Sequence, residues 1–165
     1  ILARAAWHKA QAFYETVGFA LGYGIAGYGS VPPAYRAWVP MIVRGLMAVE
    51  CATVLALLLP VTRSLGGLMA AGLFLGYGAL MALALLRGQG EIDCGCGGAP
   101  QIVSGLTLGR NLLLTGLALA VATIAPANIG AAGALLAITA GGTFYAIYGV
   151  AEKLASHLPH IRQAG

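Results

Sequence analysis

The chain has 165 residues, of which 59% are hydrophobic and only 8% are charged, and its formal net charge is +4. Soluble globular domains carry about 25% charged residues, so this composition in water would leave large apolar patches exposed. The basic residues are scattered rather than clustered, which argues against nucleic acid as a partner. A lipid bilayer accommodates such a chain, and we predict an all-α, multi-pass transmembrane bundle forming one domain over residues 1–165.

The first 37 residues read differently from the rest of the chain. Segment 1–9 lacks the apolar core of a secretory signal, and we expect it to be the end of a helix that begins before residue 1. Segment 10–37 is mildly apolar, is rich in Gly and Tyr, and carries Glu15. It predicts a helix over about 10–21 lying at the membrane interface, followed by a loop. A full membrane span here stays open as the alternative.

Four apolar runs follow, each about 20 residues long, which is the length that crosses ~30 Å of hydrocarbon. They cover about 38–59, 65–86, 106–125 and 129–150. The connections on one side of the membrane are short, whereas the longer segments, including the loop 88–105, all lie on the other side. We therefore expect the working face on the side of that loop.

The loop 88–105 contains Cys94-Gly95-Cys96. Side chains at i and i+2 of an extended chain point the same way, and Gly95 tolerates unusual backbone conformations. A disulfide between Cys94 and Cys96 can therefore close in a small, strained ring, and strained, exposed disulfides exchange readily. The following helix N-terminus favours a thiolate, whereas the negative charge of Asp93 opposes one. Asp93 and Gly97 flank the pair and shape the loop.

Other interpretations of the cysteines remain. In the first, Cys94 and Cys96 form a static disulfide or remain two free thiols. In the second, they belong to a metal site. A structural zinc site needs four ligands, commonly Cys and His, and the three histidines are not close to the pair in sequence. We therefore predict redox exchange at Cys94 and Cys96, and no metal. The remaining cysteine, Cys51, stands in an apolar run, where packing is the usual role.

Glu50 lies well inside the first run, where an ionisable residue is costly and normally faces the bundle interior with a partner. Arg44 precedes it by six positions, and Arg110-Asn111 opens the third run. These four residues predict a polar cluster beneath the Cys loop. A structural ion pair that fixes helix packing is the alternative, and the two are compatible. Aromatic and Met side chains in the runs are candidates for a quinone pocket, although ordinary packing is the more common role of such stripes.

Three features make the chain resemble the methylamine utilisation protein MauE family, within the DoxX-like membrane group. They are Trp7-His8-Lys9 with the segment up to Pro32-Pro33, the mid-helix Glu50, and Asp93-Cys94-Gly95-Cys96-Gly97 followed by Ser104 and Arg110-Asn111. One departure is Gly98, where the family usually carries an aromatic residue.

The resemblance implies a membrane thiol–disulfide redox protein of the bacterial inner membrane, with the Cys loop in the periplasm. Its partner would be a membrane-anchored, thioredoxin-like protein (MauD-like), and its client the methylamine dehydrogenase light chain. The layout is also similar to the vitamin K epoxide reductase and DsbB class, which suggests a quinone as electron acceptor. Those proteins usually carry a second Cys pair, which segment 10–37 lacks, so the partner would supply it.

Two other functions stay open: a non-catalytic membrane scaffold for the thioredoxin-like protein, and a small transporter that uses Glu50. The topology is also contested. Most basic residues flank the side of the Cys loop, which by the positive-inside rule would place that loop in the cytoplasm. The family resemblance favours the periplasm, where disulfides persist.

Overall fold

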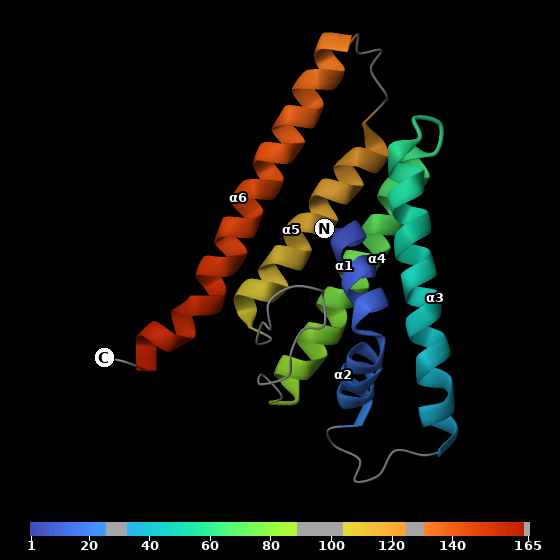
Figure 1. Ribbon diagram of the computed structural model, residues 1–165, viewed down its shortest axis with the longest axis vertical. Helices are drawn as coiled ribbons and strands as arrows, with labels where there is room; N and C mark the ends of the chain where they lie inside the picture. The colour runs from blue at the N-terminus through green and yellow to red at the C-terminus, as the bar shows by residue number, and fades with distance from the viewer. Residues whose placement is uncertain (26–32, 89–103, 125–130, 164–165) are drawn as a thin grey trace. The chain divides into compact units, whose positions relative to one another are not determined.

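The computed structural model describes residues 1–25, 33–88, 104–124 and 131–163, and every element in these ranges is a helix (Figure 1). The predicted all-α fold is confirmed. The elements are α1 (Leu2–Gln11), α2 (Phe13–Ile25), α3 (Pro33–Leu58), α4 (Arg63–Leu86), α5 (Gly105–Thr123) and α6 (Ala131–Gln163).

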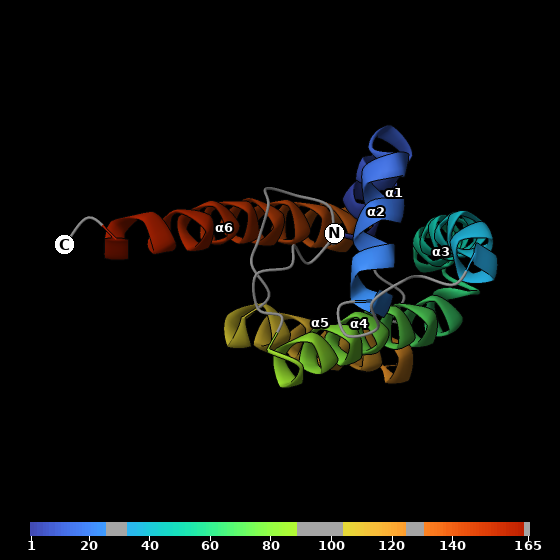
Figure 2. The ribbon, with the colours of Figure 1, turned by 90° about the horizontal axis from the view of Figure 1, so that it is seen from below.

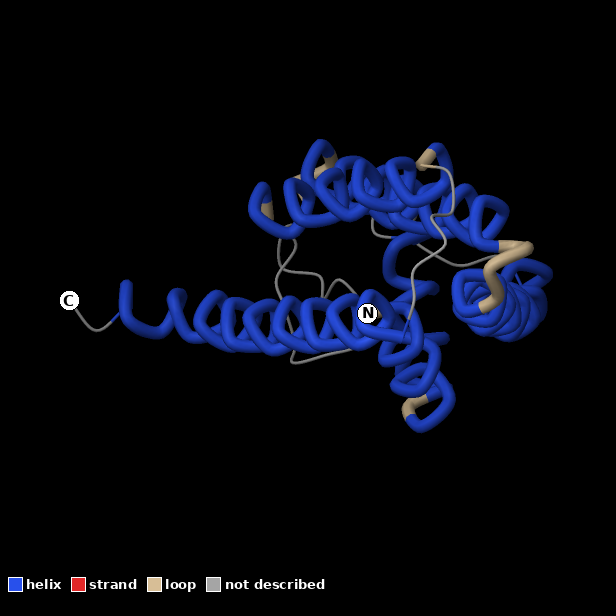
Figure 3. The backbone as a smooth tube through the Cα atoms, turned by 90° about the horizontal axis from the view of Figure 1, so that it is seen from above, coloured by secondary structure: helices blue, strands red, loops and turns tan. Residues whose placement is uncertain are grey.

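The helices fall into two units, one formed by Leu2–Ile124 and the other by residues from Ala125 onward together with Ile1. In the first unit α4 packs along α5 on one side and along α3 on the other, and α1 and α2 contact α3. Seen end-on, α4 and α5 lie side by side (Figure 2). A short turn joins α3 to α4 (Figure 3). In the second unit α6 is a single long helix.

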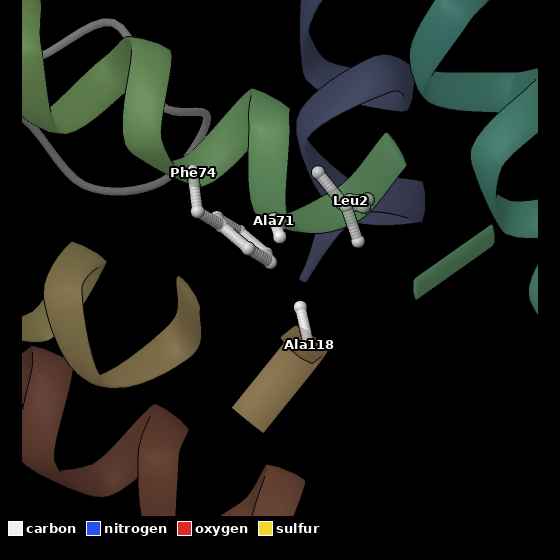
Figure 4. Packing of buried hydrophobic residues seen from close by; sticks show 5 residues of the cluster. Leu2, Ala71, Phe74 and Ala118 are labelled. Atoms are coloured by element: carbon white, nitrogen blue, oxygen red, sulfur yellow. The ribbon is translucent and has the colours of Figure 1, made fainter. Parts of the chain in front are cut away.

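Within the described residues, three helices are long and apolar enough to cross a membrane: Arg36–Leu58, Arg63–Leu86 and Gly105–Thr123. Many large apolar side chains on them are exposed, as lipid-facing side chains would be. The buried core is small, and it gathers where α1 meets α4 and α5. Figure 4 shows Phe74 and Leu2 beside Ala71 and Ala118.

Two consecutive glycines let α4 approach both of its neighbours. A Cβ at Gly66 would lie 2.7 Å from the backbone nitrogen of Leu57 on α3, and a Cβ at Gly67 would lie 2.8 Å from that of Ala122 on α5. Small residues at helix contacts allow this close approach, which is a principal source of helix association in membranes. Part of the glycine enrichment in the sequence therefore serves helix packing.

The element bounds differ from the expected ones in three places. The predicted interfacial helix at 10–21 is divided between α1 and α2, which meet at Ala12. Helix α3 begins at Pro33, because the fixed φ of proline suits the first helical turn. Among the described residues, the fourth predicted run, 129–150, includes the apolar stretch Leu135–Val150 of α6, and this helix continues through the tail to Gln163.

Candidate functional site

The predicted redox pair, Cys94 and Cys96, lies outside the described residues, as do Asp93, Gly95 and Gly97. The structure does describe the two helix ends on either side of them. At the end of α4 the backbone N–H of Arg87 donates to the carbonyls of Leu83 (3.1 Å) and Ala84 (3.2 Å). Gly88 follows with φ of 71°, a conformation that glycine adopts without strain at a helix C-terminus.

The start of α5 is fixed by its own side chains. The backbone N–H of Thr107 donates to Ser104 Oγ (3.4 Å), and the backbone N–H of Ser104 donates to Thr107 Oγ1 (2.9 Å). This reciprocal cap satisfies two donors that the first helical turn leaves without a partner. One turn further, Asn111 Nδ2 donates to the Thr107 carbonyl (3.0 Å) and contacts Met81 Sδ on α4 at 3.3 Å. The two helix ends beside the Cys segment are thus tied to each other.

A second polar centre, here called the Glu50 site, consists of Lys9 on α1, Glu50 on α3 and Tyr77 on α4. Glu50 is 0% exposed and Lys9 1%. Lys9 Nζ donates to Glu50 Oε1 at 2.8 Å, and the Tyr77 hydroxyl donates to the same oxygen. The Lys9 ammonium also lies 5.3 Å from the centroid of the Tyr77 ring, within range of a cation–π interaction.

Burial explains why these residues meet. An isolated ion inside an apolar bundle loses its hydration at a cost of several kcal/mol, which an opposite charge and hydrogen bonds must offset. Glu50 belongs to the apolar span Arg36–Leu58, so its partner has to come from another helix. Lys9 supplies the opposite charge from α1, and Tyr77 supplies a second donor from α4. The Glu50 site thereby joins three helices that are distant in sequence.

Two other members of the predicted polar cluster, Arg44 and Asn111, have contacts of their own away from Glu50. Arg44 is exposed, and its guanidinium stacks 5.2 Å from the ring centroid of Phe13 on α2. Asn111 is 2% exposed and bonds within α5 and to α4, as described above. Arg110 is half-buried on α5. In the described part of the chain, Glu50 accepts its hydrogen bonds from Lys9 and Tyr77.

Sequence reasoning therefore found the buried acid and missed its partners. In the sequence, Lys9 stands out only as part of Trp7-His8-Lys9, and Tyr77 is one of several aromatic residues in the apolar runs. A carboxylate in the middle of a span indicates that a cation must lie nearby. Arg44 is the cation nearest to Glu50 in the sequence of the same helix. Nothing local points to Lys9, which lies 41 positions away.

Three further sequence expectations bear on the site. Cys51 is a free, exposed thiol on α3. Phe74 belongs to the buried core and Met81 is 1% exposed, whereas the suggested quinone pocket stays a prediction. Among the described residues, no group of three or more His, Cys, Asp or Glu side chains is placed to hold a metal ion.

Comparison with known proteins gives a consistent result. The family model described as methylamine utilisation protein MauE matches residues 1–125. The methylamine utilization protein MauE of Paracoccus denitrificans is 39% identical over 126 residues, which cover 72% of this chain and 67% of that protein. That of Paracoccus versutus is 35% identical over 82 residues, which cover 47% of this chain and 44% of that protein, less than half its length. No solved structure matches significantly.

Proposed function

This chain belongs to the MauE family, and we propose that it serves methylamine utilisation as a membrane thiol–disulfide redox protein. The observation that carries the proposal is the position of Cys94-Gly95-Cys96. The pair falls between α4 and α5, two helices long and apolar enough to span a membrane, in a member of a methylamine utilisation family.

The proposed chemistry is disulfide exchange. A thiolate of a thioredoxin-like partner attacks the Cys94–Cys96 disulfide and forms a mixed disulfide with one of the two sulfurs. The partner's second thiolate then displaces that sulfur. The net result is a reduced Cys94–Cys96 pair and an oxidised partner, with two electrons and two protons transferred. A membrane quinone that accepts two electrons and two protons would regenerate the disulfide and leave as quinol.

The described helix ends support this proposal. The capped start of α5 and the contact of Asn111 with Met81 hold the ends of the intervening segment at one edge of the helical hairpin. A redox pair on such a segment would stay near the membrane edge, where a membrane-anchored partner can reach it. We propose a MauD-like protein as this partner and the methylamine dehydrogenase light chain as its client.

Substitution of the two cysteines tests the proposal. Cys94→Ser and Cys96→Ser should each abolish the accumulation of correctly disulfide-bonded light chain, because exchange needs both sulfurs. Cys51→Ser is the matched control, since it removes the remaining thiol without touching the pair. If both pair variants still support maturation, the protein is a scaffold for the partner rather than a redox protein.

The exchange step can be trapped directly. A thioredoxin-like partner that lacks its resolving cysteine should remain covalently attached to this chain. The adduct should be released by reductant and should be absent when both Cys94 and Cys96 are replaced. An adduct that persists in that double variant and disappears with Cys51→Ser would place the exchange at Cys51 and refute the proposed pair.

We further propose that the pair faces the periplasm of the inner membrane. After mild reduction of intact cells, a membrane-impermeant thiol reagent should label Cys94 and Cys96 in the Cys51→Ser background. Labelling that appears only after the cells are lysed would place the pair in the cytoplasm and overturn this topology.

A further inference from the structure

We infer that the outward side of α1 and α2 is a docking surface for a membrane-spanning helix of a partner protein, and that this helix carries a Lys or Arg. The surface, here called the outer face, consists of Trp7, Gln11, Tyr14 and Glu15. The inference rests on the proposed function, because the occupant of the outer face is the membrane anchor of the thioredoxin-like partner.

The outer face belongs to one side of a helix that continues across the junction of α1 and α2. The backbone N–H of Ala12 donates to the His8 carbonyl (2.8 Å), and that of Thr16 donates to the Ala12 carbonyl (2.9 Å). Residues three, four and seven positions apart therefore share a side here, as in an uninterrupted helix. The four outer-face residues are exposed, whereas Lys9 and Thr16 are buried on the opposite side.

Two contacts place the outer face beside the apolar span of α3, and both α1 and α2 contact that helix (Figure 1). Lys9 Nζ lies 2.8 Å from Glu50 Oε1, and the Arg44 guanidinium lies 5.2 Å from the ring centroid of Phe13. Arg44 is eight residues inside the span Arg36–Leu58, which corresponds to about 12 Å along the helix axis. Both contacts are therefore well within the length of α3 that would cross the hydrocarbon.

The polar members of the outer face share this depth. Gln11 lies between the two contacting residues of α1 and α2 in sequence, and Glu15 follows the second contact by two residues, about 3 Å along the axis. Side chains of this kind are costly in hydrocarbon and normally face other protein. By contrast, every exposed residue of α4 from Leu65 to Leu86 is Leu, Gly or Ala. Lipid suits that side of α4, whereas the outer face requires a polar neighbour.

Glu15 determines the chemistry of that neighbour. In the described part of the chain Glu15 makes no ion pair, and Arg44 stacks on Phe13. A Lys or Arg on an incoming helix would supply the missing positive charge. The amide of Gln11 can both donate to and accept from the same helix, and interhelical hydrogen bonds of this type hold membrane helices together. Trp7 and Tyr14, which are 66% and 87% exposed, would add large contact areas.

A second copy of this chain fits the outer face poorly. In a pair related by a twofold axis, the same patch of both copies meets. Glu15 would then lie close to its counterpart in the other copy, and two like charges in a medium of low dielectric repel each other. The charge of the outer face therefore favours a different protein over self-association.

Site-specific photo-crosslinking tests the inference in cells that express the full chain together with the full-length, membrane-anchored thioredoxin-like partner. The photoreactive residue p-benzoylphenylalanine in place of Trp7 or of Tyr14 should form a covalent adduct with the partner's anchor, located by mass spectrometry. The same residue in place of Leu75 is the matched control. Leu75 is 55% exposed on α4 and should form no adduct with the partner.

Substitution of Glu15 then tests the role of its charge. With the photoreactive residue at Tyr14, Glu15→Gln should lower the adduct yield per inserted chain on the order of tenfold. Glu15→Asp keeps the charge and should retain most of the adduct. The double variant Cys94→Ser, Cys96→Ser should also retain it, because docking of the anchor does not involve disulfide exchange.

Several results would overturn the inference. They are the absence of an adduct from both outer-face positions, an equal yield from Leu75, a yield unchanged by Glu15→Gln, an adduct with a second copy in place of the partner, and an adduct on a helix without Lys or Arg. A mixed disulfide that is trapped while the adduct is absent would remove the docking surface and leave the proposed redox function intact. The reverse outcome would support the docking surface and refute the disulfide exchange.

Discussion

Glu50 and Asn111 are both polar residues buried in apolar helices beside α4, yet they are accommodated in opposite ways. Asn111 bonds to the Thr107 carbonyl, one turn earlier in its own helix, and to Met81 Sδ. Glu50 depends on Lys9 and Tyr77, which come from two other helices. A neutral amide can be buried largely by its own helix, whereas a charge requires partners from elsewhere in the fold. The Glu50 site should therefore matter far more to the assembly of the bundle.

The sharpest test of this comparison is a double-mutant cycle at the ion pair. Lys9→Met leaves a buried carboxylate without its counter-charge, and breaking a buried pair in this way costs ~3–5 kcal/mol. Adding Glu50→Leu should restore much of the lost stability, since both charges are then gone. The free energy of unfolding in detergent measures both effects. If Lys9→Met and the double variant are equally unstable, the pair is not the source of the stability.

The next largest effect concerns how closely α4 approaches its neighbours. Gly67→Ala would place a Cβ 2.8 Å from the backbone nitrogen of Ala122, and such overpacking costs ~1–3 kcal/mol. Gly72→Ala is the matched control, because its Cβ would meet nothing within 4 Å and alanine favours a helix over glycine. Thermal unfolding should show a lower midpoint for the first variant and an equal or higher one for the second.

A smaller loss is expected at the neutral member of the comparison. Asn111→Ala removes the hydrogen bond to Thr107 and the contact with Met81, which should cost about 1 kcal/mol in unfolding free energy. Chemical denaturation of the detergent-solubilised chain measures it. A cost as large as that of Lys9→Met would erase the distinction between the two residues.

The smallest effect should be that of Arg44→Met. Arg44 is exposed and stacks on Phe13 rather than pairing with Glu50, so the change should cost less than about 0.5 kcal/mol. Comparison with Lys9→Met under identical conditions shows which cation compensates the charge of Glu50. We expect it to be Lys9 and not Arg44, although Arg44 is on the same helix as Glu50.

Sequence patterns predicted the local features of this molecule and missed the long-range ones. Three apolar runs correspond to α3, α4 and α5, because the length of a span follows from the thickness of the bilayer. Glu50 stood out because charge is rare in such a run. The fourth run lies within α6, and hydropathy alone did not reveal that this helix continues to Gln163. The partners of Glu50 depend on which helix faces meet, which no local pattern records.

The ion pair also has a consequence for biosynthesis. Lys9 leaves the ribosome 41 residues before Glu50, and Tyr77 emerges later still. Until α3 arrives, a lysine surrounded by hydrocarbon would have no counter-charge, and such insertion is costly. It follows that α1 can settle into its final position only after α3 has entered the membrane. Helix α1 is thus synthesised before α3 but reaches its final position after it, because Lys9 requires Glu50 as its partner.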